Sequence, residues 1–132
     1  MKKLLIIILL FITTAYAEVI NEYPSQALID SGIKIIDIRT VGEWKEDGLV
    51  KGAIPIEFFN EKGEYNVPLF METLAQHVKQ GEKFALICHT GSRTRIVSQF
   101  LSKQFHMEVI NLRGGTAYAK AKGITFYPYQ GK

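Results

Sequence analysis

The chain has 132 residues, of which 47% are hydrophobic and 22% are charged, and its formal net charge is +3 at pH 7. A chain of this length forms one domain around a single core. Its basic excess is small, and no segment interleaves aromatic residues with clustered arginines, so we expect no nucleic-acid partner. The single cysteine excludes a disulfide framework, and no histidine or cysteine pair has metal-ligand spacing, so we expect no metal and no cofactor.

The first 17 residues have the features of a secretory signal peptide. Two lysines precede the apolar run 4–12, and residues 15–17 read Ala-Tyr-Ala, which fits an A-x-A cleavage pattern. An uncleaved membrane anchor is the alternative, but the run is shorter than the about 20 apolar residues that span a bilayer. We therefore expect removal of residues 1–17, a single domain at residues 18–132 without membrane attachment, and a periplasmic or secreted location in a bacterium. A lone cysteine in such a compartment suggests a reactive thiol or an intermolecular partner.

From residue 19 onward, short apolar runs alternate with helical patterns, which is typical of an α/β domain. The predicted strands cover residues 19–23, 34–38, 53–56, 84–87 and 108–112. The predicted helices cover residues 24–29, 41–46, 68–79, a segment that begins at 93 or 94, and 116–122. Capping residues support these limits, because Thr40 precedes the second helix and Pro68 stands in the first turn of the third.

Helical periodicity predicts which side of each helix is buried. Trp44 is expected to point inward from the second helix. The predicted inner stripe of the third helix is Phe70, Leu74 and Val78. The predicted inner stripe of the fourth helix is Ile96, Val97, Phe100 and Leu101, with Ser98, Gln99, Ser102 and Lys103 on the opposite side.

The only cysteine, Cys88, stands where a buried strand ends and a polar loop leads into a helix. In open α/β sheets, ligands bind at the carboxyl ends of the strands, and a helix amino end offers unpaired N–H groups to an anion. Cysteine reacts as the thiolate, which a helix amino end and a nearby arginine stabilise. We therefore predict that Cys88 is a nucleophile. The alternative is a small buried side chain that ends the strand.

The loop reads C-H-T-G-S-R-T, which resembles the active-site loop of the rhodanese (sulfurtransferase) superfamily. Three further segments resemble motifs of that family in the expected order: residues 36–44, I-D-I-R-T-V-G-E-W; residues 48–55, G-L-V-K-G-A-I-P; and residues 111–115, N-L-R-G-G, followed by Tyr118 and Gly123. The resemblance spans about residues 19–123. It implies an α/β fold with a small, mostly parallel five-stranded sheet and helices on both faces.

The resemblance also implies sulfur transfer by double displacement. The Cys88 thiolate would attack the outer sulfur of thiosulfate or of a persulfide, and the resulting persulfide would pass the sulfur to a thiol or to cyanide. Arg93 is the second predicted catalytic residue, because it would attract an anionic donor and stabilise the departing charge. The predicted substrate-binding residues are His89, Thr90, Gly91, Ser92 and Thr94.

Loop length separates sulfur transfer from phosphate chemistry. The cysteine-dependent phosphatases and arsenate reductases that share this fold by resemblance have a C-x5-R loop, whereas Cys88 to Arg93 is C-x4-R. The longer loop would place its arginine at Thr94, which lacks a guanidinium. We therefore favour sulfur transfer. The alternative from another class is a catalytically weak binding or sulfur-carrier module with an exported protein partner.

Some features leave alternatives open. His89 either acts on the thiolate and its proton or only lines the pocket mouth. Arg39 either contacts an anion or forms a structural ion pair with Asp37, and the resemblance favours the ion pair. The aromatic tail, residues 124–132, either packs back on the sheet or serves as a contact. Gly114-Gly115 is expected to form a turn. Phosphate binding is the alternative, but the glycine pair alone is a weak signal for it.

Overall fold

The computed structural model describes residue 3, residues 8–10 and residues 17–131 of the chain. The predicted signal peptide lies almost wholly outside the described residues, so its cleavage stays a prediction. The strands are β1 (Val19–Glu22), β2 (Ile35–Asp37), β3 (Leu49–Val50), β4 (Ile54–Pro55), β5 (Phe84–Ile87), β6 (Val109–Leu112) and β7 (Phe126–Tyr127). The helices are α1 (Gln26–Asp30), α2 (Val41–Asp47), α3 (Val67–Ala75), α4 (Ser92–Phe105) and α5 (Gly115–Ala121). Across the described part of the chain, no helix combines the length and the apolar character that crossing a membrane requires.

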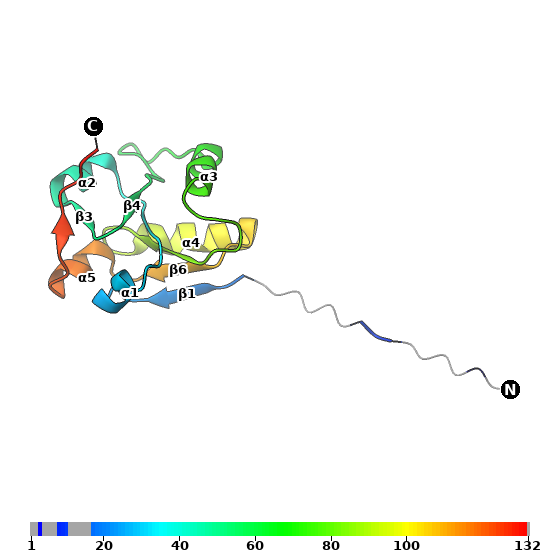
Figure 1. Ribbon diagram of the computed structural model, residues 1–132. Coiled ribbons are helices and arrows are strands. Elements are labelled where there is room, and N and C mark those ends of the chain that lie inside the picture. The colour runs from blue at the N-terminus through cyan, green and yellow to red at the C-terminus, as the bar shows by residue number, and fades with distance from the viewer. Residues whose placement is uncertain (1–2, 4–7, 11–16, 132) are drawn as a thin grey trace.

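Five strands form one parallel sheet in the order β1, β6, β5, β2, β4 (Figure 1). β5 lies between β6 and β2, and all four of its residues are fully buried, which explains their continuous apolar sequence. Because all five strands run in the same direction, their carboxyl ends meet at one edge of the sheet. The loop that begins at Cys88 therefore leaves the sheet at the centre of this edge. The predicted α/β fold with a five-stranded sheet is confirmed.

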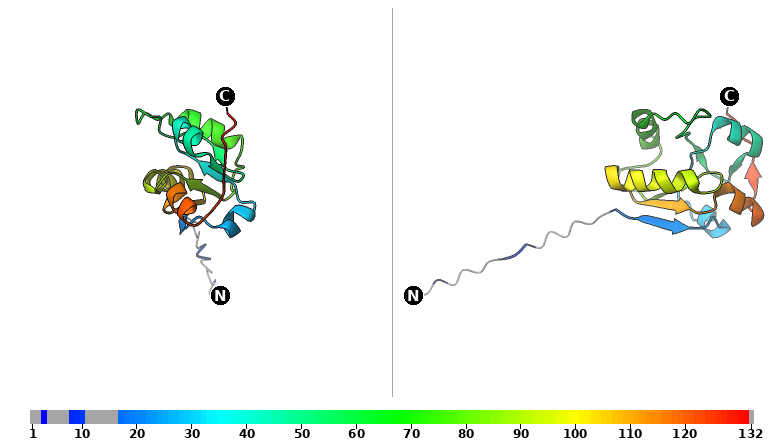
Figure 2. Two further views of the ribbon diagram at one scale, coloured as in Figure 1. Left: turned by 90° about the vertical axis from the view of Figure 1, so that its left-hand side faces the viewer. Right: turned by 180° about the vertical axis from the view of Figure 1, so that it is seen from behind.

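Alternate residues of β5 point into two separate cores, as the pleat of a strand requires. Phe84 and Leu86 pack in one cluster with side chains from α3 and α4. Ala85 and Ile87 belong to the other cluster, against which Leu28 of α1 packs. Figure 2 shows the same separation, with α1 on the far side of the sheet from α3 and α4. Helices on both faces were predicted and are found.

The aromatic tail packs back on the domain, although not on the main sheet. β7 pairs with β3 in an antiparallel two-stranded sheet, with Leu49 opposite Tyr127 and Val50 opposite Phe126. Tyr129 then reaches the indole ring of Trp44, with a centroid distance of 5.4 Å. The sequence did not predict this second sheet, because two-residue strands have no periodicity to detect.

The buried side of α4 is rotated relative to the prediction. The buried residues of this helix are Thr94, Val97, Ser98, Leu101 and Ser102. By contrast, Ile96 is 57% exposed. Residues 94, 98 and 102 are four apart and share one side of the helix, where their short side chains permit close packing on the sheet. Hydrophobicity alone placed Ser98 and Ser102 outside, and this part of the prediction is wrong.

The third helix is shorter than predicted. α3 begins next to Pro68 as expected but ends at Ala75, whereas the prediction extended it to residue 79. Val78 lies beyond the helix and is nevertheless buried, because its backbone N–H donates to the carbonyl of Leu74 and continues the turn. The predicted inner positions Phe70, Leu74 and Val78 are therefore all in the core.

Asp37 and Arg39 form an ion pair whose side chains have no solvent exposure. Arg39 Nη2 donates to Asp37 Oδ2 at 2.8 Å and to the carbonyl of Gly48 at 2.7 Å. The indole N–H of Trp44 donates to Asp37 Oδ1 at 3.2 Å. The pair thus joins the end of β2 to α2 and to its C-cap. The structural interpretation is confirmed, because the buried guanidinium of Arg39 is not available to an external anion.

Replacing Arg39 with alanine is expected to lower the free energy of unfolding by about 3 to 5 kcal/mol, because Asp37 would remain buried without its partner. The control is Lys120→Ala, since Lys120 pairs with Asp47 at the surface and its loss should cost less than about 1 kcal/mol. Denaturant unfolding followed by circular dichroism measures both values. Similar losses in the two variants would contradict the structural role given to the buried pair.

Candidate active site

Cys88 directly follows β5 at the centre of the carboxyl edge of the sheet. Its side chain is fully buried and belongs to the same core cluster as Leu86 and Val97. The burial and the position of this cysteine are compatible with both sequence interpretations, and its role as a nucleophile stays a prediction. Cys88 ends a buried strand, as a small core residue would, and it stands at the amino end of α4, as a nucleophile would.

Two groups approach the sulfur of Cys88, one from the loop and one from the first turn of α4. The backbone N–H of Gly91 donates to Sγ at 3.2 Å, and the hydroxyl oxygen of Thr94 lies 3.6 Å from Sγ. The Thr94 hydroxyl donates in turn to the carbonyl of Gly91 at 3.2 Å. Gly91 is the N-cap of α4 and has φ of 96°, a left-handed conformation that favours glycine. The loop thus folds back over the sulfur and directs one N–H group at it.

The Cys88 loop is docked on the amino end of α5. The N–H groups of Thr116 and Ala117 donate to the carbonyls of Cys88 and His89, at 2.8 and 2.9 Å. No side chain caps α5, so these two loop carbonyls accept the N–H groups that a cap would otherwise satisfy. A Cβ on Gly115 would lie only 2.3 Å from the carbonyl oxygen of Cys88. The sequence predicted a turn at Gly114-Gly115 but missed this contact, which joins loops from two different strands.

Arg93 is held by Glu43 of α2. Its Nη1 and Nη2 donate to Oε2 and Oε1 of Glu43, both at 2.8 Å, a bidentate pair that is about one quarter exposed. Glu43 Oε2 also accepts the backbone N–H of Thr40 at 2.9 Å, which completes the capping box of α2. Hydrogen bonds from Arg93 lower the pKa of Glu43 to about 2, and the pKa of Arg93 is raised in return.

The sign of this shift sets the pH range in which the Glu43 pair stabilises the fold. A carboxyl whose pKa falls on folding contributes stability above its unfolded pKa of about 4.5. That contribution is lost as the pH falls from about 4.5 toward 2. At neutral pH the pair is intact, and the charge of Arg93 beside the loop is offset by that of Glu43.

The other predicted substrate-binding residues divide into two groups. His89, Thr90 and Ser92 are exposed, so they lie at the surface of the loop, where a substrate can reach them. Thr94 is fully buried beneath the loop and reaches only the sulfur and the Gly91 carbonyl. The residue that the sequence analysis did not assign to the site is Glu43. Its place in the capping box T-V-G-E was visible, but the partner 50 residues away was not.

Within residues 17–131 and the shorter described segments, no group of three His, Cys, Asp or Glu side chains is arranged to hold a metal ion.

The docking contact predicts that Gly115→Ala will disturb the loop. The new Cβ would collide with the carbonyls of Cys88 and His89, so we expect a faster reaction of Cys88 with iodoacetamide and a lower melting temperature. The control is Gly123→Ala, where φ is also positive, +77°, but nothing lies within 4 Å of the new Cβ. It should lose about 1 to 2 kcal/mol through backbone strain alone, without a change in alkylation rate. Unchanged alkylation in Gly115→Ala would show that α5 does not hold the loop.

Comparisons with known proteins identify the family and support the fold. The sequence model of the rhodanese-like domain matches residues 22–122. Rhodanese-like domain-containing protein 17 of Arabidopsis thaliana is 28% identical over 110 residues, which cover 78% of this chain and 70% of that protein. A rhodanese-like domain protein from Staphylococcus aureus aligns with a TM-score of 0.59 at 18% identity, covering 83% of this chain and 98% of the other. Rv0390 from M. tuberculosis aligns with a TM-score of 0.60 at 18% identity, covering 75% and 80%.

The structural matches show the fold, and the family match adds the sequence motifs along it. The matched range begins at the last residue of β1 and ends just after α5, so it includes the other four strands of the parallel sheet and the Cys88 loop. The chain therefore belongs to the family of rhodanese-like domains.

Proposed function

We propose that this protein is a sulfurtransferase that carries sulfur on Cys88. In the first step the Cys88 thiolate attacks the outer sulfur of thiosulfate or of a persulfide. A new S–S bond forms on Sγ while the S–S bond of the donor breaks, and sulfite or a thiolate leaves with the electron pair. In the second step a thiol or cyanide attacks the outer sulfur, and Cys88 leaves as a thiolate.

The hydrogen bond from the Gly91 N–H to Cys88 Sγ is the observation that supports this proposal most directly. An N–H group directed at sulfur favours the anionic forms, which are the thiolate before the reaction and the persulfide after it. The amino end of α4 acts in the same direction. The exposed residues Thr90 and Ser92 are proposed to contact the donor as it reaches the loop.

Phosphate chemistry is less well supported than sulfur transfer. Thr94 occupies the place that an arginine would have in a C-x5-R loop, and its side chain is turned inward to the sulfur. Arg93 is the arginine next to it, and both of its Nη atoms are occupied by Glu43. An arginine that clamps a phosphate needs those same N–H groups for the oxyanion.

A catalytically weak sulfur-carrier or binding module is the second candidate, and two observations favour it. Cys88 is fully buried, so a donor reaches the sulfur only after the loop moves. The Arg93 guanidinium is already paired with Glu43. A module of this kind would accept sulfur slowly and pass it to a protein partner.

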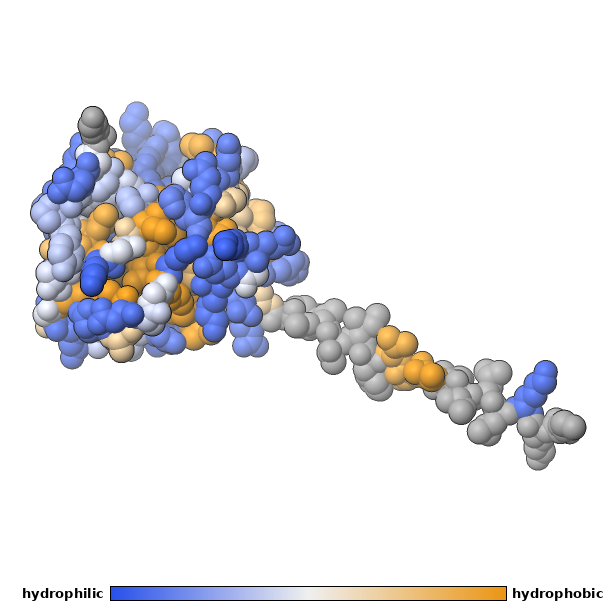
Figure 3. Space-filling model, viewed as in Figure 1, coloured by the Kyte–Doolittle hydropathy of each residue, from blue (hydrophilic) through white to orange (hydrophobic). Residues whose placement is uncertain are grey.

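We further propose that the protein is exported and cleaved after Ala17. Ile8, Leu9 and Leu10, part of the apolar run, are 68–80% exposed and lie outside the domain (Figure 3). Among the described residues the first strand begins at Val19, so a chain that starts at residue 18 keeps all the strands and helices that the structure describes. Cleavage would remove one hydrogen bond to the domain, from Ser102 Oγ to the Ala17 carbonyl.

Incubation with thiosulfate is expected to add one sulfur atom to the protein, about 32 Da by intact mass, and a reductant should remove it. Cys88→Ala should show no addition while it remains folded, as circular dichroism can verify. The rate of sulfur addition separates the two candidates. In an enzyme, Cys88 should acquire the sulfur at least as fast as the catalytic cycle turns over, whereas in a carrier module it should acquire the sulfur slowly. Sulfur addition to Cys88→Ala would refute the role of this residue.

The positive charge of Arg93 is expected to favour a dianionic sulfur donor over a monoanionic one. We compare kcat/KM for thiosulfate, a dianion, with kcat/KM for an arylthiosulfonate, a monoanion. The ratio should fall about tenfold in Arg93→Ala and should rise in Glu43→Gln, because one variant removes a positive charge and the other removes its compensating negative charge.

Arg93→Lys is the matched control for this comparison, since it keeps the charge but loses the planar fork that Glu43 binds. It should therefore keep more of the donor ratio than Arg93→Ala. Raising the salt concentration should reduce both effects, because the pair is partly exposed and screening acts over about 8 Å at physiological ionic strength. An unchanged ratio in both Arg93→Ala and Glu43→Gln would mean that Arg93 only shapes the loop.

A further inference from the structure

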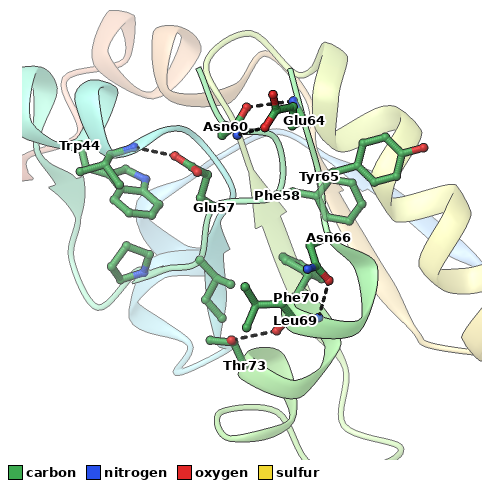
Figure 4. Close-up of a pocket in the computed structure, with 13 residues that line it drawn as sticks. Trp44, Glu57, Phe58, Asn60, Glu64, Tyr65, Asn66, Leu69, Phe70 and Thr73 are labelled. Atoms are coloured by element: carbon green, nitrogen blue, oxygen red, sulfur yellow. Dashed lines mark hydrogen bonds between the residues drawn. The ribbon is translucent and has the colours of Figure 1, made fainter. Parts of the chain in front are cut away.

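A cavity that contains none of the Cys88 loop residues lies beside α2. Its volume is about 610 Å³, which is within the range of small-molecule sites. Three segments line it: the first turn of α2, residues 55–60 after β4, and residues 64–73 at the start of α3 (Figure 4). Because Pro55 ends β4, the cavity lies toward the carboxyl edge of the sheet, where ligands bind in open α/β folds.

Aromatic side chains form the inner wall of this cavity. Trp44, Phe58 and Phe70 are buried, with 3–8% exposure, while Tyr65 and Leu69 are 63% and 59% exposed. The rings of Phe58 and Tyr65 are nearly parallel, with a centroid distance of 5.9 Å and an interplanar angle of 15°. The cavity therefore offers an apolar interior to a ligand body and aromatic surface to a cation.

The charged residues of the lining are both acidic. They are Glu57 and Glu64, and no lysine, arginine or histidine lines the cavity. The salt bridges found among the described residues include neither of them. Each carboxylate is thus without a cationic side-chain partner within the described part of the chain, although the whole protein carries a net positive charge. Glu64 is exposed and Glu57 is partly exposed, so both carboxylates are within reach of a ligand with a positive group.

Backbone and amide donors hold both carboxylates in place before any ligand binds. Glu57 Oε2 accepts the N–H of Val41 at 3.1 Å, and Glu64 Oε2 accepts the side-chain amide of Asn60 at 3.1 Å. Asn60 is itself fixed, because its Oδ1 accepts the N–H of Glu64 at 2.8 Å. Figure 4 shows the Asn60 and Glu64 side chains linked in this way. Each glutamate has a second oxygen, Oε1, that makes no hydrogen bond to a described residue. These hydrogen bonds reduce the conformational freedom that the two glutamate side chains would lose when a ligand binds.

We infer that this cavity binds a small organic ammonium compound with an aromatic or branched apolar body. The body would lie against Trp44, Phe58 and Leu69, and the ammonium group would face Glu57 and Glu64. Anions such as thiosulfate are repelled by the same two carboxylates, so the cavity is not a donor site for Cys88. The inference concerns a separate ligand and does not depend on the proposed sulfur transfer.

The test uses Trp44 as a reporter, because it is the only tryptophan of the chain and lines the cavity. The full-length protein is titrated with phenethylamine, 2-phenylethanol and 3-phenylpropionate, which share a ring and differ in charge. Tryptophan fluorescence and calorimetry should both show that the amine binds about tenfold more tightly than the alcohol at low salt, and that the carboxylate binds most weakly. Added salt should reduce the differences in affinity between the three ligands. Equal binding of all three, or tightest binding of the carboxylate, would overturn the inference.

Variants that neutralise the two glutamates test whether these residues cause the preference for the amine. The double variant Glu57→Gln, Glu64→Gln should lose the preference for the amine over the alcohol while it still binds the alcohol. The control is Glu72→Gln, an exposed position on α3 that does not line the cavity, and it should keep the preference. Thermal unfolding checks that the variants are folded. The order of affinities for the three ligands in the unmodified protein tests the inference independently of the variants. Retention of the preference in the folded double variant would refute the assignment.

Discussion

The docking of the Cys88 loop on the amino end of α5 is the contact on which the site depends. Two N–H groups, from Thr116 and Ala117, bind the carbonyls of Cys88 and His89. The absence of a side chain at Gly115 permits this approach. Because the contact uses only backbone atoms of the loop, it fixes the direction in which the chain leaves β5 without engaging the exposed side chains. Those side chains therefore remain exposed at the surface of the loop.

Helix α2 contacts one ion pair through Trp44 and forms a second one through Glu43, and the two pairs have different surroundings. The pair of Asp37 with Arg39 is fully buried and is bound by Trp44, so it acts as fixed scaffold. The pair of Glu43 with Arg93 is about one quarter exposed, so an anion in solution can compete for the guanidinium. One helix of seven residues thus supplies a rigid anchor and an exchangeable counter-charge to the same edge of the sheet.

Most of the main elements could be predicted from the sequence, because apolar runs, caps and breakers are local signals. The strand at residues 84–87 and the Thr40 cap are examples. The misses involve partners distant in the chain or exceptions to hydrophobic patterning. Pairing of β3 with β7, the contact of Gly115 with Cys88 and the fork of Arg93 on Glu43 all join residues far apart in the sequence. The rotation of α4 arose because the buried residues include Ser98 and Ser102, which hydropathy assigns to the surface.

Complete burial of Cys88 has a consequence for the chemical lifetime of the thiol. Oxidation of cysteine through sulfenic to sulfonic acid requires contact with the oxidant as well as thiolate character. Here peroxide or a disulfide of another chain meets the exposed loop residues Thr90 and Ser92 before it meets the sulfur. The loop that covers Cys88 therefore also shields its sulfur from oxidants. An oxidant, like a sulfur donor, reaches the buried sulfur only when the loop moves, so loop motion sets the rate at which the thiol can be oxidised.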